Sequence, residues 1–434
     1  MYKNKLFLLV FSLFIYVQFS ASQNNTNSPY TRFGYGDVND ANNGEQRAMG
    51  GVSIGSRSSA SINTMNPASY SSVDSMTFMF DVGASALVSH FSQSGASVNK
   101  HNANLEYITM QFPLTKWMGF SAGVLPYSFV GYDFSAKDTL LNKSGGNSVA
   151  DSITSTQSFI GNGGFTQVYM GLSVNLFKHV SLGINSYYMF GTINHYRDQS
   201  FGSTTTNTIS SSDYTSSTRK TSITANNFRF RFGAQFYNTF DKKHDVTLGV
   251  IYEPKIKLSG DFTQITTGVL NDTIDQNHTG YTNYRFELPS LFGVGVNYCY
   301  DKKLTIGIDY SLQQWKNTEY YSKKDTLSNR SKLAVGIEYQ PNYKGRYFTQ
   351  RIRYRAGFNV SDSYYKVDGV SQPKNYSLTC GLGLPLYNRA NNSTTMLNAS
   401  FEYGKLGSTV LREDYYKFTL SIAFNEHWFM KRKL

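Results

Sequence analysis

The stretch FRFRFGAQF, residues 228–236, alternates strictly between two kinds of side chain. Phenylalanine or alanine occupies every even position, and arginine, glycine or glutamine occupies every odd one. Successive side chains of a β-strand point to opposite faces, so this pattern predicts a strand with one apolar and one polar face. In a soluble sandwich the phenylalanines would face a second sheet. In a membrane barrel they would face lipid, and the arginines would face a polar lumen.

The first residues have the features of a secretory signal peptide. Lys3 and Lys5 precede an apolar run at residues 6–19, and small residues follow at 20–22. This run is too short for a spanning helix with its usual flanks, so we predict a signal peptide over 1–22 that is cleaved near Ser22. No later stretch approaches the roughly 18 consecutive apolar residues of a membrane helix.

The composition suits an exported β-protein. The chain has 33 Tyr, 31 Phe and 36 Gly but only 9 Pro. The formal charge of +12 is scattered along the chain, which favours an anionic lipid surface over nucleic acid as a partner. Cys299 and Cys380 are the only cysteines, and each lies in a predicted strand. A disulfide between these two cysteines is compatible with the sequence, but two unpaired thiols are favoured.

Alternating segments recur to the end of the chain. Short charged links, such as 241–243 and 301–303, contrast with long stretches rich in Ser, Thr, Asn and Gly near 133–163, 197–220 and 263–282. Short turns at one end and long loops at the other are typical of outer-membrane barrels. We therefore predict an all-β fold, a fourteen-stranded antiparallel transmembrane barrel over 75–425 without helices. Its strands are expected near 75–91, 103–113, 117–132, 164–176, 179–196, 221–239, 245–262, 283–299, 303–321, 331–341, 348–363, 374–387, 394–405 and 415–425.

Residues 23–74 do not alternate. They are small, polar and glycine-rich, and a short helix is expected around Gln46 to Gly50. A periplasmic tail, a disordered leader and a plug inside the barrel all remain compatible with this composition. Residues 426–434 are expected to form a C-terminal periplasmic tail.

Several motifs resemble the FadL family of outer-membrane transporters. The run Arg47-Ala48-Met49-Gly50-Gly51 and the later Asn66-Pro67-Ala68 are similar to the hatch of that family. The start and the end resemble Bacteroidota versions of these barrels, in SPYTRFG at 28–34 and NEHWF at 425–429. Segments similar to family strand motifs follow in the family's order: LGVIYEP at 248–254, Leu288-Pro289, Asp309-Tyr310 with Trp315, and VGIEY at 335–339.

The resemblance implies a location and a function. Residues 23–74 would plug a barrel in the outer membrane of a Gram-negative bacterium, surrounded by lipid and lipopolysaccharide. The barrel would take up hydrophobic small molecules passively, such as long-chain fatty acids or aromatic compounds, without enzyme activity or a cofactor. The alternative is a scaffold that transports nothing and binds outer-membrane protein partners, similar to the PorV-like component of type IX secretion. The implied hatch residues are Arg47, Gly50, Gly51, Asn66, Pro67 and Ala68.

Pro126 lies inside the third predicted strand, three residues after Gly123. Proline has no N–H to donate, so within a sheet it marks an edge, a bulge or a break. In proteins similar to the FadL family, a kink in the third strand opens a lateral window for the ligand. An ordinary bulge near the rim is the competing interpretation.

Two predicted strands carry alternating arginines. If the apolar residues face lipid, the arginines point inward, because a lipid-facing arginine costs about 2–4 kcal/mol at the membrane midplane. Two roles stay open for them. They pair with inward carboxylates and join plug to wall, or they bind the carboxylate or phosphate headgroup of a ligand. The arginines are Arg229, Arg231, Arg351, Arg353 and Arg355, and the carboxylates are Asp81, Glu253, Asp309 and Glu338.

Catalytic and metal-binding motifs are weak. Two GxSxG matches, at 51–55 and 119–123, fall in the predicted plug and in the middle of a strand. A catalytic serine of this type needs a strand-to-helix turn, so neither match predicts an esterase. The seven histidines show no metal-ligand spacing, and we expect neither a catalytic nor a metal site.

Overall fold

The computed structural model describes most of the chain. The predicted signal peptide and residues 428–434 of the predicted C-terminal tail lie outside the described residues, whereas Glu426 and His427 belong to a strand and not to a tail. Within the described part, no helix is both long and apolar enough to cross a membrane. The described residues are 25–93, 95–142, 151–203, 216–268, 273–280, 284–367, 369–372, 374–388, 393–407 and 411–427.

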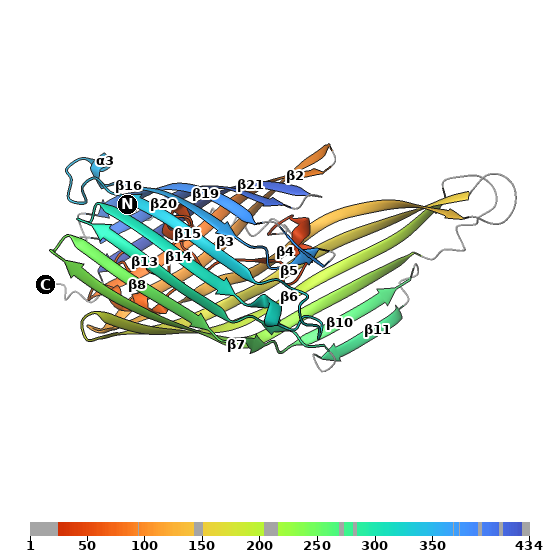
Figure 1. Cartoon of the computed structure of the whole chain (residues 1–434), viewed down its shortest axis with the longest axis horizontal. Coiled ribbons are helices and arrows are strands. Elements are labelled where there is room, and N and C mark those ends of the chain that lie inside the picture. The colour runs from red at the N-terminus through yellow and green to blue at the C-terminus, as the bar shows by residue number, and fades with distance from the viewer. Residues whose placement is uncertain are drawn as a thin grey trace, which may run out of the picture.

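Fourteen antiparallel strands form one closed barrel (Figure 1). The wall closes where β2 pairs with β21, with Thr77 opposite His427. The sequence prediction of fourteen barrel strands is confirmed. The barrel strands are β2 (Thr77–Gln93), β3 (Ala96–Thr115), β4 (Met118–Asn142), β5 (Asp151–Leu176), β6 (Val180–Ser203), β7 (Ser217–Phe240), β8 (His244–Glu253), β13 (Leu291–Tyr300), β14 (Leu304–Gln313), β15 (Arg330–Tyr339), β16 (Arg353–Ser361), β19 (Asn375–Asn388), β20 (Ser393–Gly407) and β21 (Arg412–His427).

The predicted long loops are mostly strand. The described parts of these stretches, 133–142, 151–163, 197–203 and 216–220, continue the β4–β5 and β6–β7 hairpins, which project beyond the barrel as one sheet that we call the arm (Figure 1). The stretch 263–282 contains most of a third hairpin, β10 (Asp261–Thr267) with β11 (Thr273–Gly280), which pairs with β7. Threonine is β-branched and suits strands, so a polar composition alone misassigned these segments to loops.

Two other strands have bounds that differ from the prediction, because a proline or a helical turn interrupts the strand. The predicted strand 245–262 ends at Glu253, because Pro254 cannot donate to the next strand. The predicted strand 348–363 begins with a helical turn, α3 (Phe348–Arg351), so Arg351 lies outside β16. The prediction of no helix after residue 75 is therefore wrong at this turn, and again at the short 3-10 helix η4 (Trp315–Asn317). Smaller pairings join β9 (Ile256–Lys257) to β12 (Glu287–Leu288) and β17 (Lys366–Val367) to β18 (Val370–Ser371).

The outer face of the barrel is apolar and the inner face is polar. In the opening stretch, Phe228 is 62% exposed, whereas its neighbour Arg229 is 6% exposed. The same exposed apolar set continues around the wall, through Val250, Val294 and Ile308. A belt of this extent is too large to face water, so the strands span a bilayer and the phenylalanines meet lipid. The two cysteines are both unpaired in this structure.

Residues 25–74, which we call the N-terminal segment, fill the inside of the barrel. Their side chains are largely buried, and Tyr35, Asn66, Ala68 and Tyr70 have no measurable exposure. The predicted helix is present but begins two residues earlier than expected, at Gly44. The elements of this segment are η1 (Pro29–Arg32), β1 (Asp37–Val38), α2 (Gly44–Ala48) and η2 (Pro67–Ser72).

Candidate functional site

The barrel wall is incomplete between β3 and β4. These strands pair only near the short turn that joins them, from Thr115 opposite Met118 to Ile108 opposite Val124. Beyond that point, β2 is the only strand among the described residues that pairs with β3, and β4 continues beside β5. We call the space between residues 96–107 of β3 and 125–142 of β4 the wall gap.

Pro126 lies where the two strands separate. The register between β4 and β5 shifts between Pro126 and Ser128, which is a β-bulge. Just below it, Gly123 sits so close to β3 that a Cβ atom would lie 2.3 Å from the carbonyl oxygen of Ile108. The sequence prediction of a bulge or break at Pro126 therefore agrees with the structure, and the wall gap begins beside it.

Strand β1 of the N-terminal segment lies against the β4 side of the wall gap. It is antiparallel to β4, with Asp37 opposite Phe129 and Val38 opposite Ser128. The N–H of Asn39 donates to the carbonyl of Tyr127 at 2.9 Å and extends this pairing. Some backbone groups of β4 that have no partner on β3 are therefore hydrogen-bonded to the N-terminal segment at β1 and Asn39.

Residues before β1 contact both strands that border the wall gap. On β3, the amide of Asn102 accepts from Asn27 at 2.6 Å, and the amide of Asn104 donates to the carbonyl of Asn25 at 2.7 Å. On β4, the hydroxyl of Thr31 donates to the carbonyl of Gly131 at 3.1 Å. The N-terminal segment therefore bridges the two strands from inside the barrel.

Gly36 allows β1 to approach β4 this closely. Its φ angle is +85°, in the left-handed region that favours glycine. A Cβ atom at this position would lie 2.3 Å from the carbonyl oxygen of Phe129. A larger residue would therefore both strain the backbone and push β1 away from the wall.

The predicted hatch motif Asn66-Pro67-Ala68 begins η2 and lies against β6 and β7. The side chain of Asn66 accepts from the N–H of Ala68 at 3.1 Å and donates to the carbonyl of Ile54 at 2.8 Å. Gly183 and Gly233 make room for it, because a Cβ atom on Gly233 would lie 2.2 Å from the Asn66 oxygen. The glycine within the stretch FRFRFGAQF is thus explained by contact with the motif.

The other predicted hatch residues lie around α2. Gly50 and Gly51 both have positive φ angles, and Gly50 passes so close to β16 that a Cβ atom would lie 2.8 Å from the backbone of Phe358. Arg47 forms an ion pair with Glu106 at 2.8 Å, and Lys417 pairs with the same carboxylate at 2.6 Å. Glu106 was not singled out from the sequence, although it pairs with a cation of the N-terminal segment and one of the wall.

Arg229 and Arg231 both bind the carboxylate of Glu253 on the neighbouring strand. All three residues are buried. Arg231 also donates to the backbone carbonyls of Thr64 and Met65 in the N-terminal segment, each at 3.3 Å. These arginines therefore connect the wall to the N-terminal segment, the first of the two roles that the sequence left open.

A second charged group joins β15 and β16 to α2. Arg355 binds Glu338 at 2.6 Å and Glu45 at 3.2 Å. Arg353 lies farther from the same two carboxylates, at 3.8 and 3.7 Å. Arg351 does not join this group, because its helical turn places it over the ring of Phe348, 6.0 Å from the ring centroid.

The remaining predicted carboxylates have partners other than arginine. Asp309 accepts from the backbone N–H groups of Ser53 at 2.5 Å and Ile54 at 2.6 Å. Asp81 accepts from the hydroxyl of Tyr107 at 3.2 Å. The sequence correctly placed both carboxylates on the inner face, but the expectation of arginine partners for them was wrong.

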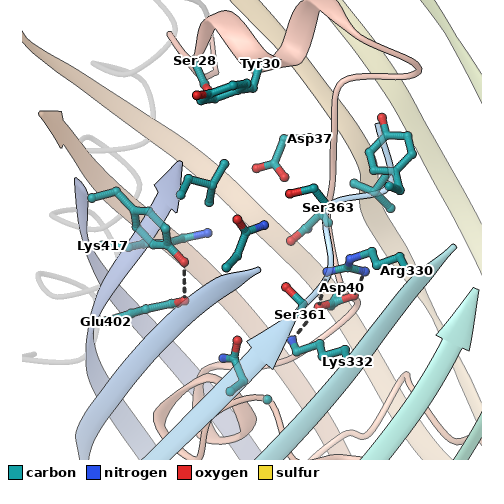
Figure 2. Close-up of a pocket in the computed structure, with 18 of the residues that line it drawn as sticks. Ser28, Tyr30, Asp37, Asp40, Arg330, Lys332, Ser361, Ser363, Glu402 and Lys417 are labelled. Carbon is teal, nitrogen blue, oxygen red and sulfur yellow. Dashed lines mark hydrogen bonds and ion pairs between the residues drawn. The ribbon is translucent and has the colours of Figure 1, made fainter. Parts of the chain in front are cut away.

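A polar cavity of about 200 Å³ lies behind β1 (Figure 2). Asp40 lies between Arg330, at 3.0 Å, and Lys332, at 2.6 Å. Burial raises the pKa of Asp40, but these two cations outweigh that effect and hold the pKa below its ordinary value. Charged groups that also line the cavity are Asp37, Arg47, Glu402, Glu413 and Lys417.

Aromatic side chains close the barrel at its long-hairpin end. Tyr35 packs against Tyr320, Trp315 and Phe165, with ring centroids 5.3, 5.8 and 6.0 Å away. Its N–H donates to the hydroxyl of Tyr364 at 3.0 Å. Tyr364 belongs both to this cluster and to the lining of the cavity, so the rings border the cavity.

The serines of the two GxSxG matches have structural roles. Ser53 belongs to the backbone that binds Asp309. Ser121 lies inside β4, where its hydroxyl donates to the carbonyl of Met110 at 2.8 Å. Neither stands on a strand-to-helix turn.

Comparison with known proteins finds solved structures with a similar fold and one matching family. Solved structures with a similar fold include a FadL homologue from Pseudomonas aeruginosa, at 12% identity and a TM-score of 0.56 over 90% of this chain and 99% of that one. The toluene transporter TodX from Pseudomonas putida, at 12% identity and a TM-score of 0.55, covers the same shares. The toluene transporter TbuX from Ralstonia pickettii, at 14% identity and a TM-score of 0.54, matches 89% of this chain and 98% of its own length.

At such identities the likeness shows the fold alone. No curated protein matched the sequence. The family match, in contrast, covers residues 1–434, the whole sequence. The chain therefore belongs to the BamG family.

Proposed function

We propose that this chain is an outer-membrane barrel for passive uptake of hydrophobic small molecules, and that β1 holds its lateral exit closed. The observation that carries the proposal is the wall gap between β3 and β4, with β1 paired to the free side of β4. A barrel wall normally has no edge, because every strand is paired on both sides. A gap covered by two residues of the N-terminal segment is a suitable place for an exit into the membrane.

Three further observations support this function. The apolar belt reaches the start of the wall gap, where Leu105 of β3 and Val124 of β4 are exposed on the outside. The cavity lies directly behind β1, since Gly36, Asp37 and Val38 line it. The fold is that of barrels described as toluene transporters, and none of the similar structures named above is described as an enzyme. We infer that the chain likewise has no catalytic role.

In the proposed route, a ligand enters from the long-hairpin end. It displaces the aromatic contacts of Tyr35, and η1 and β1 then move away from β4. The ion pairs of Arg47 with Glu106 and of Glu45 with Arg355 keep the remainder of the N-terminal segment in place, together with the hydrogen bonds from Arg231 to its backbone. The ligand leaves sideways through the wall gap. Since internal carboxylates already neutralise the luminal arginines, we assign them this holding role rather than capture of a ligand headgroup.

A reversible tether between β1 and β4 tests this proposal. Val38 and Ser128 are opposite each other and both are buried, so cysteines at these positions are placed to form a disulfide. In a Cys299→Ser, Cys380→Ser background, the oxidised Val38→Cys, Ser128→Cys protein is expected to lose at least about ninety per cent of its uptake of radiolabelled toluene. Reduction is expected to restore uptake. Each single-cysteine variant is the control.

Equal uptake by the oxidised and reduced proteins would exclude an exit through the wall gap. If neither the parent protein nor any variant takes up toluene or a long-chain fatty acid, the uptake function itself is wrong. The two failures are therefore distinguishable.

A second function is favoured by the closed and polar interior. The cavity is lined by charged groups, and of the described aromatic cluster around Tyr35 only Tyr30, Tyr364 and Tyr365 reach its lining. The arm also projects beyond the barrel, where a partner can reach it (Figure 1). These features suit a scaffold that binds other outer-membrane proteins.

Gentle purification from the native membrane separates the two functions. Mass spectrometry of the purified barrel would detect small molecules and proteins together. A stoichiometric lipophile without a protein partner supports uptake. A stoichiometric protein partner with no lipophile supports the scaffold.

A further inference from the structure

The arm has a free backbone edge along β4. Beyond Phe129, β4 pairs with β5 as far as Asn142, while among the described residues no strand pairs with its other side. Figure 1 shows β4 at the margin of the arm, next to the space that separates it from the β2–β3 hairpin. A row of unpaired N–H and C=O groups is a template for another strand.

Gly131 shows which backbone groups face this edge. Its N–H donates to the hydroxyl of Thr31 at 3.2 Å, and its carbonyl accepts from the same hydroxyl at 3.1 Å. Backbone groups of a strand alternate in direction, so Asp133, Ser135 and Lys137 present their N–H and C=O groups on the same side as Gly131. These three residues are exposed.

The same edge already accepts one short strand. β1 pairs with Ser128 and Phe129 in the antiparallel direction, immediately before the free stretch. We propose that residues 132–138 of β4, which we call the arm edge, bind an extended segment of a partner protein that adds an antiparallel strand beyond the contact of Gly131 with Thr31. Main-chain hydrogen bonds supply the affinity in this mode of recognition, and alternate side chains supply the specificity.

The side chains of the arm edge define the partner segment. On one face, Phe134 packs against Tyr132 and Phe159, with ring centroids 5.7 and 5.3 Å apart. On the other face lie Asp133 and Lys137, which have opposite charges. The matching segment carries apolar residues at alternate positions on the aromatic face. Its opposite face carries polar residues, with a base beside Asp133 and an acid beside Lys137.

A second copy of this chain fits the arm edge less well. Two copies in one membrane have their β4 strands rising in the same direction, so the strands could pair only in parallel. The pairing that β1 begins is antiparallel. The occupant is therefore a different protein, and its binding requires no passage of a ligand through the barrel.

Site-specific photo-cross-linking of the full chain in its native membrane tests the proposal. The photoreactive amino acid p-benzoylphenylalanine is placed at 133, 135 or 137, and the cross-linked residues are mapped by mass spectrometry. The expected result is one partner segment, with contact positions that decrease by about two residues at each step along β4. This order is the signature of an antiparallel strand.

Proline substitution gives the second readout. Ser135→Pro removes an N–H that faces the partner and leaves the β5 side intact, so cross-linking from position 137 is expected to fall at least about tenfold. Ser135→Ala is the matched control and is expected to stay within about twofold of the parent. If Ser135→Pro does not reach the membrane, Lys137→Pro with the cross-linker at 133 replaces it.

Cross-links that scatter over several proteins, that reach a second copy of this chain, or that are absent at all three positions overturn the proposal. Full cross-linking by the proline variant overturns it as well, because side-chain contacts alone would then hold the partner.

Discussion

Replacing Gly36 with valine is expected to release β1 and raise the permeability of the barrel to a hydrophobic dye by about 30- to 100-fold. The φ angle of +85° is unfavourable for a β-branched residue, at a cost of about 1–3 kcal/mol. The clash with the carbonyl of Phe129 adds to this cost. Since each 1.4 kcal/mol changes an equilibrium about tenfold, about 2–2.8 kcal/mol corresponds to the stated rise in the open population. Dye uptake by cells that express equal amounts of each variant measures the effect.

Gly95 provides the matched control for this substitution. Its φ angle is also +85°, but nothing lies within 4 Å of a Cβ atom placed there. Gly95→Val therefore carries a similar backbone strain without touching β1, and its dye uptake is expected to equal that of the parent. If Gly95→Val raises dye uptake as much as Gly36→Val does, backbone strain explains the rise, and displacement of β1 does not.

Replacing Glu253 with glutamine is expected to cause the largest loss of stability among single substitutions in the lumen. It leaves Arg229 and Arg231 buried without a carboxylate, and removal of one partner from a buried ion pair costs about 3–5 kcal/mol. The temperature at which the folded barrel loses its altered gel mobility measures this loss. We expect the transition to fall clearly below that of the parent protein.

Asp301→Asn is the control for Glu253→Gln. Asp301 pairs with Lys303 at 2.6 Å, but both side chains are substantially exposed. Exposed pairs of this kind contribute about 0–1 kcal/mol, so the transition temperature is expected to change little. Equal transitions for Glu253→Gln and Asp301→Asn would show that the buried ion pairs of Glu253 do not stabilise the folded barrel.

The sequence predicted the barrel because its signal is local. A strand between lipid and lumen must alternate, and Phe228 to Phe236 or Val246 to Tyr252 show the alternation without any knowledge of their neighbours. The inward direction of Arg229 and Arg231 followed from the same period. Pro126 also acts locally, and the structure has a bulge there.

The site was less predictable because its contacts join distant parts of the chain. Asp40 meets Arg330 across 290 positions, and no local pattern selects that pair. β1 has only two residues, Asp37 and Val38, which is too short to show a period. β1 forms because one side of β4 has no partner on β3. The sequence of β4 alone does not reveal which of its two sides lacks a neighbouring strand.

The same limit explains the errors in the hairpins. Residues 133–142 resemble loop composition, but β5 supplies them with backbone partners out to Asp151. Arg351 continues the arginine alternation of Arg353 and Arg355 in the sequence, yet a helical turn interrupts the strand before it. Alternation marks which residues are able to share a face, and tertiary pairing decides where the strand begins.

Hydrogen–deuterium exchange of the full chain in lipid nanodiscs tests the central claim most directly. The claim is that β1 is paired with β4 across the wall gap in the membrane. We predict that the amides of Asp37 and Asn39 exchange slowly, since the N–H groups of both residues face β4. Fast exchange at these residues, at the rate of an unstructured peptide while the barrel strands remain protected, would contradict the claim and leave the wall gap open.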